Sequence, residues 1–205
     1  MIIDFTNPQL RYRQQHASLR NEALARALGC KPQDQPRIID ATAGLGRDSF
    51  ILASLGFTVI MLERSPQLYS LLEDALQRAR QVPDLAPIIQ RMQLIQADAI
   101  TWLAALSPAD YPDIIYLDPM FPERTKSAKV KKEMIFLQDA CGNDEDADKL
   151  LQVAAFCAKK RIIVKRPRMA PTLAGRQPDF QREGRSCRFD VYLNYSKQTE
   201  PGTRN

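Results

Sequence analysis

Short runs of apolar, mostly β-branched residues recur along the chain, separated by longer segments in which apolar residues follow helical spacing. Each run is about as long as one strand, and its nearly continuous apolar character is typical of strands buried on both faces of a parallel sheet. The runs lie at residues 37–43, 57–63, 92–98, 113–118 and 161–167. Strands that alternate with helices predict an α/β fold with a twisted, mostly parallel sheet and helices on both of its faces.

The helical segments carry apolar residues three and four positions apart. The clearest covers residues 66–80, where Ser65 supplies an N-cap and Pro66 occupies the first helical position. We assign its leucine stripe to the core rather than to a cofactor site. Further helices are predicted at residues 19–28, 50–55, 100–106 and 144–158. Two C-terminal segments, residues 180–182 and 187–195, predict an antiparallel hairpin.

The length of 205 residues and the hydrophobic content of 44% suit one α/β domain with a full core. We predict that this domain covers residues 37–195. Residues 1–36 are predicted to form an N-terminal segment with one helix that stops at Gly29. The last residues, 196–205, are predicted to form a flexible tail.

Basic residues outnumber acidic ones, with 29 Lys and Arg against 24 Asp and Glu, a net charge of +5 and a pI near 9.1. The excess is concentrated in residues 159–188, which contain ten basic and two acidic residues. Such a local excess favours an anionic partner. Near the N-terminus, Arg11, Arg13 and Arg20 precede or open the first predicted helix, and we expect them to face solvent.

The four cysteines and the single histidine follow no spacing that is typical of a metal site. Cys30, Cys141, Cys157 and Cys187 form no C-x-x-C pair, which suits reduced thiols in a cytoplasmic protein. The sequence contains no apolar run of about 20 residues and no apolar N-terminal region. It therefore predicts a cytoplasmic protein with no metal, no signal peptide and no membrane span, and it leaves the oligomeric state open.

Acidic residues stand where several of the predicted strands end. Glu63, Asp98 and Asp118 end the second, third and fourth strands. Parallel strands bring their carboxyl ends to one edge of the sheet, where open α/β proteins bind their ligands. Crowded carboxylates repel one another unless a ligand or a partner uses them. The set therefore indicates a functional edge of the sheet.

A glycine loop with Gly44 and Gly46 lies between the first strand and a helix. That context is typical of loops that bind nucleotide-like ligands, because glycines let the backbone approach the ligand closely. Asp40 and Asp48 add carboxylates at the edge of the loop. Glu63 ends the next strand, where a carboxylate can accept both hydroxyls of a ribose.

The segment Asp118-Pro119-Met120-Phe121 closes the fourth strand, and its proline cannot continue a central strand. A carboxylate, the carbonyl that follows it and an aromatic ring are the groups needed to hold an amino group on a planar base. Taken alone, the segment suits a strand-to-loop turn capped by Asp118 equally well.

Together these features resemble the class I S-adenosylmethionine-dependent methyltransferases, which have a Rossmann-like fold. The segment that starts at Asp118 resembles the (Asp/Asn)-Pro-Pro-(Tyr/Phe) motif of enzymes that methylate exocyclic amines. More narrowly, the chain is similar, from about residue 3 to residue 192, to the family of ribosomal RNA small subunit methyltransferase J, which makes N2-methylguanosine in 16S ribosomal RNA. The similar segments are residues 40–48, 61–64, 116–122, 126–128, 130–134 and 164–167. Members of that family carry an additional N-terminal stretch before the part matched here.

The resemblance implies S-adenosyl-L-methionine as methyl donor, S-adenosyl-L-homocysteine as product, and 16S ribosomal RNA or the small ribosomal subunit as partner. It implies the cofactor contacts Arg47, Asp48, Glu63, Arg64, Asp98, Ala99 and Asp118. The residue pattern adds Asp40, Gly44 and Gly46 to this set. Asp98 can accept a hydrogen bond from the adenine amino group.

The leading hypothesis is an RNA guanine-N2 methyltransferase. In it, the Asp118 carboxylate and the Pro119 carbonyl accept the two hydrogens of the guanine amine, and Phe121 stacks on the base. The target base must be unpaired or flipped, because a base in a duplex is out of reach. The residues expected to hold RNA phosphates are Lys126, Lys129, Lys131, Lys132, Lys165, Arg166 and Arg168.

Three alternatives stay open. A nicotinamide-dependent oxidoreductase would use the same glycine loop and Glu63, although Ser49 replaces the third glycine of G-x-G-x-x-G and no proton-relay pair is evident. A non-catalytic RNA-binding module would keep the cofactor-binding fold of an ancestral enzyme without its activity. A methyltransferase could also act on an exocyclic amine of another nucleic acid.

Overall fold

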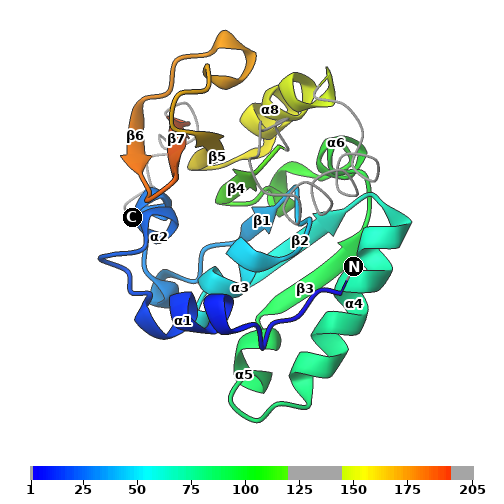
Figure 1. The fold of residues 1–205 in the computed structure, drawn as a ribbon. Coiled ribbons are helices and arrows are strands. Elements are labelled where there is room, and N and C mark those ends of the chain that lie inside the picture. Colours follow the sequence, from blue (N-terminus) through cyan, green and yellow to red (C-terminus); the bar gives the residue numbers. More distant parts are fainter. Residues whose placement is uncertain (1, 120–144, 195–205) are drawn as a thin grey trace, which may run out of the picture.

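The computed structural model describes residues 2–119 and 145–194. They form a seven-stranded sheet in the order β3-β2-β1-β4-β5-β7-β6 (Figure 1). Its strands are β1 (Ile38–Asp40), β2 (Val59–Glu63), β3 (Met92–Gln96), β4 (Ile114–Leu117), β5 (Arg161–Pro167), β6 (Phe180–Glu183) and β7 (Cys187–Leu193). The five predicted strands and the hairpin are confirmed. Strands β1, β3 and β4 end before their apolar runs do because the chain leaves the sheet for the loops at its carboxyl edge, whereas β2 begins two residues after the start of its run.

Strands β1 to β5 are parallel, whereas β7 runs antiparallel to β5 and β6 runs antiparallel to β7. From β1 the chain moves outward through β2 to β3, then crosses back to place β4 on the other side of β1. The strand order therefore reverses between β1 and β4. In open α/β sheets, the crevice outside this switch point is where ligands bind. The predicted fold class is confirmed.

Two apolar clusters cover the two faces of the sheet. Ile38 belongs to one cluster and Ile39 to the other, and Ile114 and Ile115 divide in the same way, as the two-residue period of a strand requires. Helices α2, α3, α4 and α5 contribute to the first cluster, and α6 and α8 contribute to the second (Figure 1). The helices are α1 (Pro8–His16), α2 (Ala23–Leu28), α3 (Arg47–Ser54), α4 (Pro66–Arg80), α5 (Ala86–Ile89), α6 (Ala99–Ala104) and α8 (Glu145–Cys157). Short 3-10 turns are η1 (Pro32–Asp34), η2 (Pro108–Asp110) and η3 (Leu173–Gly175).

The N-terminal part differs from the sequence prediction. Helix α1 was not predicted, because it has no buried residue and hence no apolar period, although Asn7 caps it and Pro8 opens it. The helix predicted at residues 19–28 begins only at Ala23, and Leu19 is exposed. Gly29 stops α2 in a left-handed conformation, as predicted.

The N-terminal segment packs against the sheet domain. Phe5 is buried, and its ring lies 5.1 Å from that of Phe50 on α3, centroid to centroid. The Arg78 guanidinium of α4 donates to the Ile3 carbonyl at 2.6 Å. Residues 2–28 therefore share a core with the strands, while the predicted tail at residues 196–205 lies outside the described residues.

Among the described residues, no helix is both long and apolar enough to cross a membrane. Within the same ranges, His, Cys, Asp and Glu side chains form no group of three or more that could hold a metal ion.

Candidate functional site

A cavity of about 310 Å³ opens at the carboxyl ends of β1, β2 and β4, at the switch point of the sheet. It is bounded by the glycine loop, by the start of α6 and by α8. The predicted site residues that line it are Asp40, Gly44, Arg47, Asp48, Glu63, Arg64, Asp98, Ala99, Asp118, Pro119 and Lys165. Residues from five separate strands and loops thus meet in one hollow.

Glu63 ends β2 and is almost fully buried. Its carboxylate accepts the backbone N–H of Gly44 at 3.0 Å and that of Ser65 at 2.8 Å. Burial raises the pKa of Glu63 above its usual value, and these two hydrogen bonds oppose the rise. Each carboxylate oxygen can accept two hydrogen bonds, so Glu63 keeps capacity for further donors in the cavity.

The glycines of the loop serve two purposes. Gly44 adopts φ +52°, and a Cβ atom there would meet nothing closer than 3.8 Å, so the backbone conformation alone requires glycine. Gly46 has φ +66°, and a Cβ atom there would lie 2.9 Å from Leu72 of α4. Gly46 does not line the cavity but lets the loop pack down on α4, which sets where α3 begins.

Asp98 is the N-cap of α6. Its Oδ1 accepts the backbone N–H of Thr101 at 2.9 Å and the Thr101 hydroxyl at 3.0 Å. Next to it the cavity wall is apolar, with Ile100 of α6 and Leu150 of α8. This end of the cavity is therefore an apolar slot with a carboxylate at its edge.

Asp40 ends β1 and is buried beneath the loop. Its Oδ2 accepts the Ser49 hydroxyl at 2.6 Å, and its Oδ1 accepts the Thr42 N–H at 3.1 Å. Burial raises the pKa of Asp40 to about 7, with a further contribution from the carboxylates of Asp48 and Asp118. Asp40 thus carries its proton up to neutral pH.

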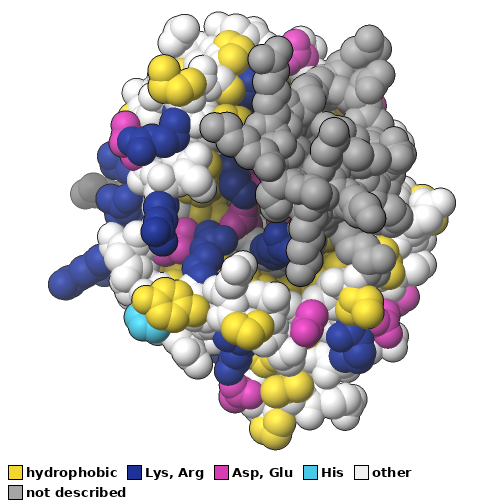
Figure 2. All heavy atoms as spheres, in the orientation of Figure 1, with side chains coloured by type: hydrophobic (Ala, Val, Ile, Leu, Met, Phe, Trp, Pro, Cys, Tyr) yellow, Lys and Arg dark blue, Asp and Glu magenta, His cyan; other side chains and the backbone are white. Residues whose placement is uncertain are grey.

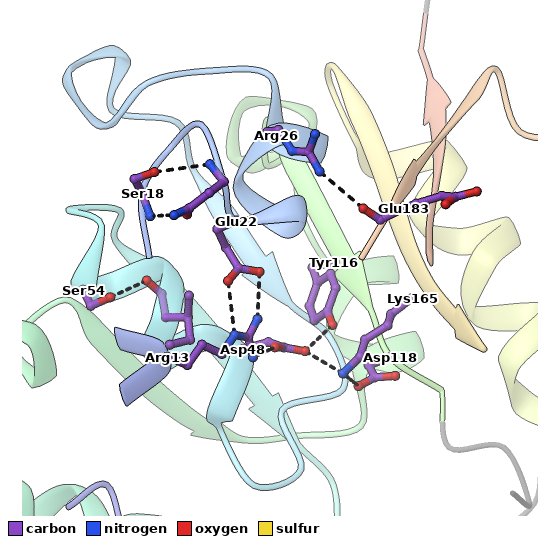
Figure 3. A network of polar contacts seen from close by, with 12 residues as sticks. Arg13, Ser18, Glu22, Arg26, Asp48, Ser54, Tyr116, Asp118, Lys165 and Glu183 are labelled. Carbon is purple, nitrogen blue, oxygen red and sulfur yellow. Dashed lines mark hydrogen bonds and ion pairs between the residues drawn. The ribbon is translucent and has the colours of Figure 1, made fainter. Parts of the chain in front are cut away.

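Asp48, in the first turn of α3, is the centre of a buried polar network (Figure 3). Its Oδ1 accepts from Arg13 of α1 at 2.8 Å, and its Oδ2 accepts from the Tyr116 hydroxyl at 2.7 Å and from Lys165 at 2.8 Å. Burial by itself would raise the pKa of Asp48, but Lys165 and Arg13 outweigh it and hold that pKa well below its usual value. Asp48 is therefore ionised.

Lys165 joins this network to the end of β4 (Figure 3). Its Nζ also donates to Asp118 Oδ2 at 2.8 Å, while the Asp118 N–H donates to the Thr42 hydroxyl at 2.6 Å. Burial would lower the pKa of Lys165, but the Asp48 and Asp118 carboxylates raise it above its usual value. A permanent cation thus fixes the Asp118 carboxylate at the mouth of the cavity.

The structure revises two expectations for RNA-binding residues. Arg166 is only 2% exposed, and its guanidinium donates to the Pro171 carbonyl at 2.7 and 3.0 Å, so it supports the chain after β5 and is not available to a phosphate. Lys165 faces the cavity carboxylates instead of an open basic surface. Arg168 is exposed and pairs with Glu183 at 2.5 Å. The other predicted residues, Phe121, Lys126, Lys129, Lys131 and Lys132, lie outside the described residues.

Two side chains of the network were not predicted from the sequence. Arg13 was expected in solvent, yet it bridges Asp48 and Glu22. Tyr116 was taken as a core residue, and its ring is buried, but its hydroxyl reaches Asp48. The Asn7-Pro8 start of α1 could have placed Arg13 on a helix, although nothing local indicates its partner.

The cavity fits a cofactor that contains adenosine. The slot beside Asp98 suits a planar adenine, Glu63 offers oxygens to the ribose hydroxyls, and the Asp118 carboxylate suits a cationic group. Arg64 follows β2 and also lines the cavity. Its guanidinium donates to Asp146 of α8 at 2.8 Å and so links the end of β2 to that helix across the cavity.

Comparisons with known proteins agree with this geometry. The sequence profile of a family described as putative SAM-dependent methyltransferases matches residues 1–194. The chain is 51% identical over 195 residues to ribosomal RNA small subunit methyltransferase J of Nitrosococcus oceani, an alignment that covers 95% of this chain and 77% of that protein. It is 52% identical over 191 residues to the protein of the same name from Thioalkalivibrio sulfidiphilus, with 93% and 75% covered.

Solved structures give the same picture. The crystal structure of a SAM-dependent methyltransferase from Neisseria gonorrhoeae superposes with a TM-score of 0.76 and 37% identity, covering 100% of this chain and 78% of that one. An rRNA methyltransferase from Streptomyces viridochromogenes has a TM-score of 0.55 at 16% identity, with 84% and 82% covered, and shares the fold.

Proposed function

This chain belongs to the ribosomal RNA small subunit methyltransferase J family of SAM-dependent methyltransferases, and we propose that it methylates the N2 atom of a guanosine in 16S ribosomal RNA. The observation that carries the proposal is the fixed carboxylate of Asp118 at the mouth of the cavity, with Pro119 beside it. Family membership gives no support to the oxidoreductase alternative.

The cofactor end of the proposed site is lined by acidic residues. Glu63 accepts hydrogen bonds from the ribose hydroxyls, and Asp98 accepts one from the adenine amine in the slot formed by Ile100 and Leu150. When bound, S-adenosylmethionine supplies an electrophilic methyl group on a sulfonium cation. The Asp118 carboxylate lies at this end of the cavity and can offset part of that positive charge, whereas the charge of Asp48 is already matched by Arg13 and Lys165.

The substrate end is formed by Asp118 and Pro119. The guanine amine is a poor nucleophile because its lone pair is conjugated with the ring. The Asp118 carboxylate and the Pro119 carbonyl accept its two hydrogens and turn the lone pair toward the methyl group. Lys165 contacts Oδ2 of Asp118 and holds the carboxylate in one orientation, which removes part of the entropic barrier to transfer. As the N–C bond forms and the methyl–sulfur bond breaks, S-adenosylhomocysteine is left, and the proton that the nitrogen loses passes to the Asp118 carboxylate and then to solvent.

The proposal is tested with tritiated S-adenosylmethionine and small ribosomal subunits from cells that lack the modification, followed by nucleoside analysis. Labelled N2-methylguanosine in 16S RNA is the expected product, and a different labelled nucleoside would reject the assignment. Asp118→Asn should slow single-turnover transfer by about a hundredfold or more, on the scale of losing one positioned electrostatic group.

The matched control is Asp110→Asn, an exposed acid in η2 outside the cavity lining. Binding of S-adenosylhomocysteine and thermal melting show that each variant is folded. If the folded Asp118→Asn variant transfers methyl groups at the wild-type rate, then Asp118 has no role in catalysis and only caps the turn after β4.

A further inference from the structure

A second, wider hollow of about 960 Å³ lies on the other side of the Asp48 network. Its walls are α1, the start of α2 and the turn between β6 and β7. Arg13, Asp48 and Lys165 line both this hollow and the cofactor cavity, so the polar network of Figure 3 is the partition between them. The two spaces therefore adjoin at Lys165, which also holds the Asp118 carboxylate.

We propose that this hollow, the α1–hairpin groove, binds the single-stranded RNA that flanks the target nucleotide. The inference rests on the proposed function and names the surface that this function needs. Glu63 on β2 and Asp98 after β3 assign that side of the cavity to the cofactor. Asp118 directly follows β4, and the next strands in the sheet are β5, β7 and β6. The acceptor must therefore approach from the β5–β7 side, where the groove lies.

The groove carries an exposed aromatic platform. The rings of Tyr12 and His16, one turn apart on α1, stack with centroids 4.0 Å apart and an interplanar angle of 27°. His16 Nδ1 lies 2.8 Å from the Tyr12 carbonyl, which fixes the pair further. Tyr12 is nevertheless 65% exposed. Because every base has a π-face, such a platform binds successive bases of a single strand without needing a particular sequence.

The charges of the groove suit phosphates. Its three acidic side chains are all engaged within the protein: Glu22 with Arg13, Asp48 with Arg13 and Lys165, and Glu183 with Arg168. Two exposed arginines face the groove without an acidic partner in the described part of the chain. Arg26 donates only to the Glu183 carbonyl, at 3.3 Å, and Arg185 stands in the hairpin turn. Figure 2 shows Lys and Arg side chains gathered on this side of the molecule, over α2 and the β6–β7 hairpin.

These observations favour a single strand over a duplex. In a duplex the π-faces of each base are covered by the neighbouring base pairs, so a duplex could not use the Tyr12 platform. A strand whose bases stack on α1 and whose phosphates pair with Arg26 and Arg185 would deliver its next nucleotide over Lys165 to Asp118. The groove would thus set the direction from which the target base enters the cavity.

Binding of a fluorescein-labelled single-stranded RNA and of a duplex of equal length to the full chain tests the proposal by anisotropy over a range of salt concentrations. Arg26→Gln/Arg185→Gln should bind the single strand about tenfold more weakly. It should also lower the slope of log affinity against log salt by about 1.4, or about 0.7 per phosphate contact. The control Arg80→Gln/Arg91→Gln removes two charges and one bond to a carbonyl near α4 and α5, outside the groove. A slope equal to that of the control would overturn the proposal.

The platform is tested by comparing two variants of one residue. Tyr12→Phe keeps the aromatic ring, whereas Tyr12→Leu keeps only apolar bulk. If bases stack on this ring, the Tyr12→Phe variant should bind single-stranded RNA about tenfold more tightly than the Tyr12→Leu variant. The same ratio is expected in the KM for small ribosomal subunits, with kcat changing far less. Equal affinities for the two variants would remove the platform from the RNA site.

Two further outcomes separate this inference from others. Weaker binding of the Arg26→Gln/Arg185→Gln variant to small subunits, with unchanged binding to deproteinised 16S RNA, would mean that the groove takes a ribosomal protein, and would overturn the RNA proposal. If wild-type protein transfers no methyl group, the proposed function fails by itself. If wild-type protein is active and the groove variants match the controls in binding and KM, only the groove assignment fails.

Discussion

The buried carboxyl group of Asp40 should make the protein less stable as pH rises toward neutral. We consider Asp40→Asn, which has nearly the same shape and cannot ionise. Its Oδ1 can still accept the Thr42 N–H, and its amide nitrogen takes the place of Oδ2 and can donate to the Ser49 hydroxyl, reversing that bond. The substitution therefore imitates the protonated carboxyl group of the wild type.

The size of the effect follows from the two pKa values of Asp40. The pKa is about 7 in the folded protein against 3.8 for the free side chain. Between these values the native state holds a proton that the unfolded state has lost, so the free energy of unfolding falls by about 1.4 kcal/mol per pH unit. Over the whole window the loss is about 4 kcal/mol. The asparagine variant has no such loss.

Urea denaturation between about pH 5 and pH 8 measures the difference in unfolding free energy between Asp40→Asn and wild type. The variant should be more stable by about 2 kcal/mol near pH 5 and by about 4 kcal/mol near pH 8, with a plateau above pH 7. Asp74→Asn, an exposed acid on α4, controls for general effects of charge. A difference that does not change with pH, or a variant less stable than wild type near pH 8, would refute the elevated pKa of Asp40.

Two other substitutions probe the cavity. Glu63→Ala should weaken binding of S-adenosylhomocysteine by about 10- to 100-fold, because the ribose hydroxyls lose a buried charged acceptor. Calorimetry measures this affinity, with the exposed Glu73→Ala as the control. Equal affinities for the two variants would show that Glu63 does not contact the cofactor. Lys165→Gln should lower the free energy of unfolding near pH 7 by about 2 kcal/mol, less than for a fully buried pair because Lys165 is 29% exposed. Since the pKa of Asp48 is depressed, its contribution is present above the usual Asp pKa and fades as pH falls below it, so in urea denaturation the Lys165→Gln deficit should shrink below about pH 4. If the Lys165→Gln variant stays equally destabilised relative to wild type below about pH 4, then Lys165 does not stabilise the fold through the charge of Asp48.

Local patterns in the sequence determined the strands, most of the helices and the acidic edge of the sheet. An apolar run, an N-cap such as Ser65 or a stop such as Gly29 acts within one turn or one strand, so it can be recognised without knowledge of the fold. Because parallel strands end at a common edge, the strand pattern alone predicts that Glu63, Asp98 and Asp118 lie near one another. Helix α1 could not be predicted in this way because its residues have no apolar period.

Which charged side chains meet depends on how distant parts of the chain pack together. Asp48 pairs with Arg13, 35 positions away, and with Lys165, 117 positions away, and no local signal joins those residues. For the same reason the sequence could not separate Lys165, which reaches the cavity, from Arg166, which is buried against the chain after β5. Adjacent residues of a strand point to opposite faces of the sheet, so their surroundings depend on everything that packs there. The sequence sets the type and order of the elements, whereas the partners of each charged side chain depend on how distant elements come together.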